Sequence, residues 1–168
     1  MAISMYQASV PAFVQMLTSL QGILKKGVAY AEQKKFEPSV LINARLAPDM
    51  HPLYRQVYIV TDQAKGGAAR LCGQEPPVYP DTEMTFPDLD ARLKKTIDYV
   101  RSFKPEQFNG AEDRDIQLQF GPNKVSFKGL AFLFHITLPN LYFHTTTAYN
   151  ILRHNGVDVG KRDYMGTF

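Results

Sequence analysis

Apolar residues recur at spacings of three and four in four stretches of this 168-residue chain. The first stretch is the clearest, because Val10, Phe13, Leu17 and Leu24 fall on one face of a helix expected over residues 4–33. Three further stretches with the same spacing cover residues 50–72, 85–103 and 129–154. A helix with an apolar stripe is stable in water only when that stripe packs against other elements. The chain is therefore predicted to be an all-α protein built around four helices.

The spacing of apolar residues changes to two between the third and the fourth predicted helix. Ile116, Leu118 and Phe120 alternate with glutamines, and a Gly-Pro-Asn turn over residues 121–123 follows. This alternation predicts a two-stranded hairpin. The sequence has no repeat and no low-complexity segment, so residues 1–168 are expected to form one domain. The predicted fold is a four-helix bundle with a small β-hairpin between helices 3 and 4.

Composition excludes several classes of protein. The net charge of +3 is small and scattered, which argues against nucleic-acid binding. Cys72 is the single cysteine, so neither an intrachain disulfide nor a thiolate zinc site can form within the chain. No apolar run approaches the roughly 20 residues of a membrane span, and the N-terminus lacks the pattern of a secretory signal. A cytoplasmic protein without a membrane segment is expected.

Polar residues interrupt the stripe of the last predicted helix, LPNLYFHTTTAYNILRHNG at residues 138–156. His144 falls in the middle of this stripe, with Asn140 one turn before it and Thr147 one turn after it. Polar groups that are buried need hydrogen-bond partners. Three explanations remain open: a core histidine bonded to Asn140, Gln56 or a buried water, a pocket for a small molecule, or a metal site.

Two glutamines of the second predicted helix are the best candidates to meet this polar stripe. Gln56 and Gln63 lie at the edge of that helix's apolar face and can reach inward as hydrogen-bond partners. His51, His135 and His154 are expected to point away from His144. The residues predicted to line a polar pocket are Asn140, His144, Thr147 and Gln56.

Acidic residues provide no candidate pair for general acid–base catalysis. Asp49, Asp62 and Asp81 are scattered along the chain, and Asp62 lies opposite the stripe of its helix, where solvent exposure is expected. The Gly66-Gly67 pair lies within a helical pattern and follows no strand, so it is not a phosphate-binding loop. No catalytic residue can be named from these patterns.

Three segments together resemble a known family: LAPDMHPLYRQV, AKGGAARLCGQEPP and LPNLYFHTTTAYNILRHNGVDVGK. They are similar to an uncharacterised bacterial family, domain of unknown function nineteen ninety-three, within the DinB/YfiT-like superfamily. The resemblance covers essentially the whole chain. It implies a DinB-like four-helix bundle that is often dimeric, and a homodimer is therefore expected.

The resemblance also implies where a metal would bind. Metal-binding members of the superfamily carry one histidine on the second helix and a His-x-x-x-His pair on the fourth. His144 matches the second histidine of that pair, Asn140 stands at the place of the first, and the second helix offers no inward histidine. A degenerate metal site is therefore expected. No cofactor is predicted, and a zinc or nickel ion would have to bind at His144.

These observations leave the function open between two classes. The first is a cytoplasmic protein of unknown function whose polar pocket around His144 binds a small molecule. The alternative is a metal-dependent hydrolase or thiol transferase of the DinB-like type, in which a divalent metal or a neutral His144 acts as the base. The sequence does not decide whether the protein is an enzyme.

Overall fold

The computed structural model describes residues 3–166 and is mostly helical, as predicted. The long helices are α1 (Met5–Lys34), α3 (Leu53–Leu71), α4 (Phe86–Arg101) and α6 (Leu138–His154). The short helices are α2 (Ser39–Asn43), α5 (Gly129–Ala131), α7 (Lys161–Met165), the 3₁₀-helix η1 (Pro105–Phe108) and the π-helix η2 (Phe132–Thr137). Strands β1 (Asp115–Phe120) and β2 (Asn123–Lys128) complete the described elements. Among them, no helix combines the length and the apolar character that crossing a membrane requires.

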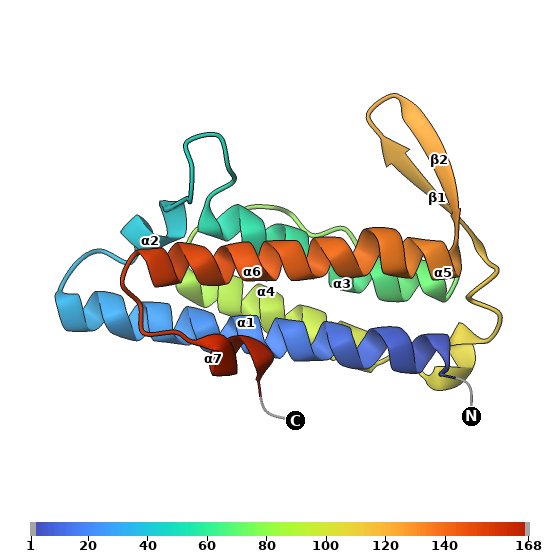
Figure 1. Ribbon diagram of the computed structural model, residues 1–168, viewed down its shortest axis with the longest axis horizontal. Coiled ribbons are helices and arrows are strands. Elements are labelled where there is room, and N and C mark those ends of the chain that lie inside the picture. The colour runs from blue at the N-terminus through green and yellow to red at the C-terminus, as the bar shows by residue number, and fades with distance from the viewer. Residues whose placement is uncertain (1–2, 167–168) are drawn as a thin grey trace.

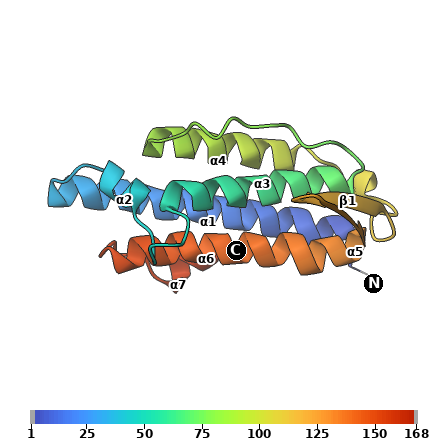
Figure 2. The same ribbon diagram turned by 90° about the horizontal axis from the view of Figure 1, so that it is seen from above.

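The long helices α1, α3, α4 and α6 lie side by side with their axes nearly parallel (Figures 1 and 2). Helices α1 and α6 run in one direction, and α3 and α4 run in the other. The ring of Phe86, at the start of α4, accordingly lies beside Gly27, near the end of α1. Because α3 and α4 are parallel, residues 72–85 have to run back along the length of α3, as Figure 2 shows. We call these residues the crossing loop.

Side-chain caps set the start of two long helices. The Ser4 hydroxyl accepts a hydrogen bond from the backbone N–H of Gln7, and the Gln7 side chain accepts one from the backbone N–H of Ser4. Thr85 caps α4 in the same way by accepting from the N–H of Asp88. Such bonds satisfy backbone donors that the first helical turn leaves free.

The core lies between the long helices. The fully buried side chains of these helices include Phe13, Leu17, Leu53, Leu93 and Ile151. Helix α3 comes close to η2 at Gly67, where an added Cβ would lie 2.6 Å from Cγ2 of Thr137. The small residues at this end of α3 therefore allow close helix packing.

The hairpin stands out from the side of the helices, at the end where α3 stops and α5 begins (Figure 1). Its strands are antiparallel and Phe120 pairs with Asn123, so Gly121 and Pro122 form the connecting turn. The sequence also predicts that Pro139 kinks or divides the last helix. In the structure the irregular segment is η2, which ends just before α6, and Pro139 lies in the first turn of α6. The π-helical segment directly precedes Pro139, which has no N–H to contribute to the helical hydrogen bonds, so the irregularity of this continuous helix lies where a proline kink is expected.

Two segments have more structure than the sequence indicates. The polar loop predicted over residues 104–113 contains η1, whose Phe108 is buried and packs edge-to-face against Tyr6. The tail after residue 156 lies along α1, where Asp163 of α7 pairs with Lys26 at 2.7 Å. Neither segment has a hydrophobic period of its own, because its contacts come from distant residues. Thr167 and Phe168 lie outside the described residues.

Candidate functional site

A hydrogen bond joins α6 to α3 at the predicted polar stripe. Nδ1 of His144 lies 2.7 Å from Oε1 of Gln56, and Nε2 of Gln56 donates to the backbone carbonyl of His51 at 2.8 Å. Because a carbonyl can only accept, the second bond fixes the orientation of the Gln56 amide and turns Oε1 toward His144. Nδ1 of His144 must then carry the proton. In the neutral imidazole, Nε2 is left as an acceptor.

The environment of His144 favours this neutral form. Burial lowers the pKa of His144, and the nearby His51 imidazole lowers that pKa further. The His144 side chain is only half-buried, so it lies at the edge of the core and not inside it. The Phe143 ring packs edge-on against the imidazole, with 5.1 Å between ring centroids. A neutral imidazole with a fixed tautomer can accept a proton or a hydrogen bond through Nε2.

The other two predicted pocket residues on α6 donate to backbone carbonyls one turn earlier in the chain. Nδ2 of Asn140 donates to the carbonyl of Ile136 at 2.7 Å, which leaves the amide oxygen of Asn140 free to accept. The Thr147 hydroxyl donates to the carbonyl of Phe143 at 2.8 Å, in its own helix. Thr145 bonds back along α6 in the same way. We therefore define the α3–α6 seam by Gln56, Asn140 and His144.

A cavity of about 790 Å³ opens beside Asn140, between the second half of α3, strand β1 and η2. Its size lies within the range of small-molecule sites. Apolar walls come from Ile116, Leu118, Phe132 and Ile136, and Asn140 lines one end. His144 does not line the cavity but follows Asn140 by one helical turn, about 6 Å along the axis. The sequence gives no sign that the hairpin forms a wall, because β1 meets α3 only through the tertiary fold.

The donors at this site do not fit a three-histidine metal centre. His51 is exposed at the start of α3, and His135 and His154 are exposed elsewhere. Gln56 binds Nδ1 of His144, so it orients the imidazole in the structure and does not replace a missing ligand. Within residues 3–166, no group of three or more His, Cys, Asp or Glu side chains is placed to hold a metal ion. Whether the protein binds a metal therefore stays a prediction.

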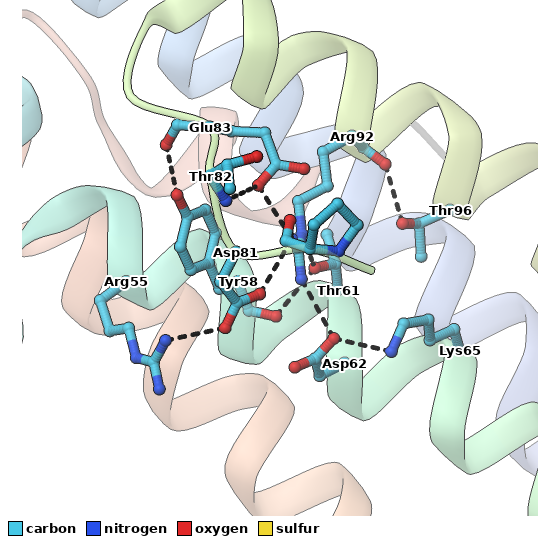
Figure 3. A network of polar contacts seen from close by, with 11 residues as sticks. Arg55, Tyr58, Thr61, Asp62, Lys65, Asp81, Thr82, Glu83, Arg92 and Thr96 are labelled. Atoms are coloured by element: carbon cyan, nitrogen blue, oxygen red, sulfur yellow. Dashed lines mark hydrogen bonds and ion pairs between the residues drawn. The ribbon is translucent and has the colours of Figure 1, made fainter. Parts of the chain in front are cut away.

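A second polar group lies on the opposite side of α3, and the sequence patterns do not predict it (Figure 3). The Arg92 side chain of α4 is only 1% exposed and forms ion pairs with Asp62, Asp81 and Glu83, each at 3.1 Å. Nε of Arg92 donates to the Thr61 hydroxyl at 2.7 Å. We call these five residues the Arg92 cluster.

The Arg92 cluster corrects one sequence prediction and extends another. Asp62 and Asp81, predicted to be scattered, both bind the same guanidinium, and Asp62 also pairs with Lys65 at 2.7 Å. The Asp62 side chain is 44% exposed, as expected, and it is an ion-pair partner at the surface. The physical reason is the crossing loop, which brings Asp81 and Glu83 back over α3 and α4. Every nitrogen of the Arg92 guanidinium has a partner, so the cluster holds the loop in place.

Comparisons with known proteins agree with this architecture. The family model described as "Domain of unknown function (DUF1993)" matches residues 5–165. A similar solved structure is that of a DinB family member protein from Shewanella denitrificans, which is 42% identical. The match covers 97% of this chain and 92% of that chain, with a TM-score of 0.89. No curated protein matches the chain. The chain therefore belongs to the family described as Domain of unknown function (DUF1993), among the DinB-like proteins.

Proposed function

We propose that this protein binds a small polar molecule at the α3–α6 seam, through a hydrogen bond to Nε2 of neutral His144. The observation that carries the proposal is the chain of bonds from the His51 carbonyl through Gln56 to Nδ1 of His144. This chain fixes both the tautomer and the ring before any ligand arrives. Preorganisation of this kind is typical of binding and catalytic sites, because less ordering is needed on binding.

The cavity supplies the space for the rest of the molecule. Asn140 lines the cavity and offers a free amide oxygen, and His144 follows one turn further along α6. A ligand of a few non-hydrogen atoms beyond Asn140 would span the axial distance of about 6 Å between the two turns. A donor on the ligand would meet Nε2 of His144, and its apolar part would lie against Phe132 and Ile136.

Ligand-observed NMR with a library of small polar fragments tests this proposal. We expect a subset of hydroxyl- and amide-bearing fragments to bind the wild type, and Asn140→Leu and His144→Gln to weaken the same subset. His154→Gln is the matched control, because His154 is an exposed histidine at the end of the same helix. Fragments that bind the wild type and both seam variants equally, or no binding at all, would overturn the proposal.

The alternative function is a metal-dependent hydrolase or thiol transferase of the DinB-like type. One observation favours it: a histidine that ligates a metal usually donates its other ring N–H to an oxygen, as Nδ1 of His144 does to Gln56. His51 is the nearest candidate for a second imidazole, since it affects the pKa of His144. A complete site would still need ligands from outside this pair, so we place this alternative second.

We further infer that the four long helices act together as a four-helix bundle and that the chain forms a homodimer in the cytoplasm. Support for a dimer comes from exposed large apolar side chains on α5, η2 and α6: Leu130 is 50% exposed, Phe134 48% and Phe143 57%. Sedimentation at tens of micromolar should give twice the chain mass of 19.0 kDa. A monomer at that concentration would contradict the inference.

A further inference from the structure

The charged residues that line the cavity differ in whether they have an oppositely charged partner. The acidic residues are Asp62, Glu75 and Asp115. Asp62 pairs with Lys65 and Arg92, and Asp115 pairs with Lys128 at 2.7 Å. Glu75 is an exposed residue of the crossing loop.

The cationic side of the cavity contains an arginine with no acidic partner. Lys65 is matched by Asp62 at 2.7 Å, and one guanidinium nitrogen of Arg114 donates to the Leu71 carbonyl at the end of α3. Arg70, in the last turn of α3, also lines the cavity. Among residues 3–166, Arg70 forms no ion pair with a carboxylate within 4.0 Å. Its guanidinium is therefore available for a ligand.

A neighbouring glycine allows the Arg70 side chain to lie against its own helix. An added Cβ at Gly66 would clash with Nη1 of Arg70, so the guanidinium occupies the space next to Gly66 that a Cβ would fill. The guanidinium of Arg70 therefore lies one turn back along α3, at the wall of the cavity.

The remaining lining groups suit an organic molecule with a negatively charged end. Gln63, Gln74 and Gln117 add carboxamides near the charged wall, and Ile116 and Phe132 add a buried apolar surface. Arginine binds carboxylates through two parallel N–H donors, with a geometry that a lone lysine cannot match.

We propose that Arg70 is the anion-recognition residue of this cavity and that the ligand is a small organic carboxylate. The carboxylate binds the guanidinium of Arg70, and the apolar body of the ligand lies along η2 toward Asn140. This inference rests on the proposed small-molecule function, and it assigns the chemical class of the ligand. It places the charged group of the ligand at the end of the cavity away from His144.

A panel of carboxylates and their primary amides tests the proposal, with benzoate and benzamide as one such pair. Isothermal titration at low salt should show at least one carboxylate that binds the wild type about tenfold more tightly than its amide, as a charge-assisted bond predicts. Arg70→Gln should remove that preference. Arg153→Gln, a change at an exposed arginine of α6, should keep it.

A second variant moves the guanidinium but keeps its charge. Gly66→Ala should reduce the preference for carboxylates without lowering thermal stability, since alanine favours the helix. An unchanged preference in Arg70→Gln or in Gly66→Ala would overturn the proposal, as would a panel in which no acid binds more tightly than its amide. Phenyl phosphate is included as a third probe, and tighter binding of phenyl phosphate than of benzoate would reject the carboxylate in favour of a phosphate ester.

The two proposals can fail separately. Loss of carboxylate preference in Arg70→Gln, together with unchanged binding in His144→Gln and Asn140→Leu, would support the Arg70 inference and reject the function proposed for the α3–α6 seam. Fragment binding that needs His144 but shows no preference for acids would do the reverse.

Discussion

The Arg92 cluster and the α3–α6 seam lie on opposite sides of α3, and they differ in how many of their polar atoms have partners within the chain. Arg92 is almost fully buried, and all three of its guanidinium nitrogens have partners in the chain. His144 is half-buried and uses one ring nitrogen, so Nε2 remains an acceptor. A polar group whose bonds are all satisfied internally stabilises a fold, and one held rigid with a free site can bind something else. The Arg92 cluster therefore has a structural role, and the α3–α6 seam is the candidate functional site.

The cavity is lined by residues of both regions. Asp62 and Lys65 belong to its wall, and Asp62 is also a partner of Arg92. The Arg92 cluster therefore holds both the crossing loop and one charged wall of the cavity in place.

The largest expected effect is that of Arg92→Met. Removal of the guanidinium breaks its hydrogen bonds to Asp62, Glu83 and the Thr61 hydroxyl, and one bond to a charged group contributes about 1.5–3 kcal/mol, so the unfolding free energy should fall by about 3 kcal/mol. Arg55→Met is the control, because Arg55 pairs with Asp81 but is 43% exposed, and such pairs contribute about 1 kcal/mol or less. Urea denaturation measures both. Similar losses in the two variants would remove the contrast between a buried anchor and a surface pair.

His144→Ala is expected to have a smaller effect. The change leaves Oε1 of Gln56 without its donor and removes packing against Phe143, so the free energy of unfolding should fall by about 1–3 kcal/mol. His154→Ala should change it by less than about 0.5 kcal/mol, because His154 is exposed. If His144→Ala changed the unfolding free energy as little as this control does, the bond to Gln56 would not hold α6 to α3.

The pH dependence of stability should be weaker still, and its sign follows from the pKa of His144. That pKa lies below 6.5 in the folded state, because burial and His51 disfavour the charged imidazole. As the pH falls through 6.5, the unfolded chain takes up a proton that the folded chain does not, so the unfolding free energy falls. The loss ends below the lowered pKa of the folded state. Urea denaturation across this range should show a flatter profile for His144→Gln than for the wild type, and parallel profiles would contradict a neutral His144.

Metal binding is expected to give the smallest effect. Elemental analysis of untagged protein should find no stoichiometric metal, and zinc and nickel titrations should be weak and unchanged in His144→Ala. The reason is the ligand count, since no group of three or more His, Cys, Asp or Glu side chains among the described residues is placed to hold a metal ion. Stoichiometric metal that disappears in His144→Ala would make the metal-dependent enzyme the leading function. It would also show that His144 ligates a metal ion.

Local patterns predicted the features that depend on neighbours in sequence. The caps at Ser4 and Thr85 follow from residue type and spacing, and the back-bonding of Thr145 and Thr147 follows from their place within a helix. Gln56 could also be predicted as a partner of His144, because it lies at the inward edge of the apolar stripe predicted for α3. What could not be predicted was the half-burial of His144, since burial depends on how the helices pack.

The sequence by itself determined the helices, the hairpin, the inward stripe of α6 and the family, because periodicity, capping and motifs are properties of adjacent residues. The tertiary structure decided three further features. The parallel course of α3 and α4 sends the crossing loop back along α3 and gathers Asp62, Asp81 and Glu83 around Arg92. The position of the hairpin closes a cavity over Arg70 and Asn140. Segments far apart along the chain make these contacts, so chain topology and packing, and not local propensity, bring their side chains together.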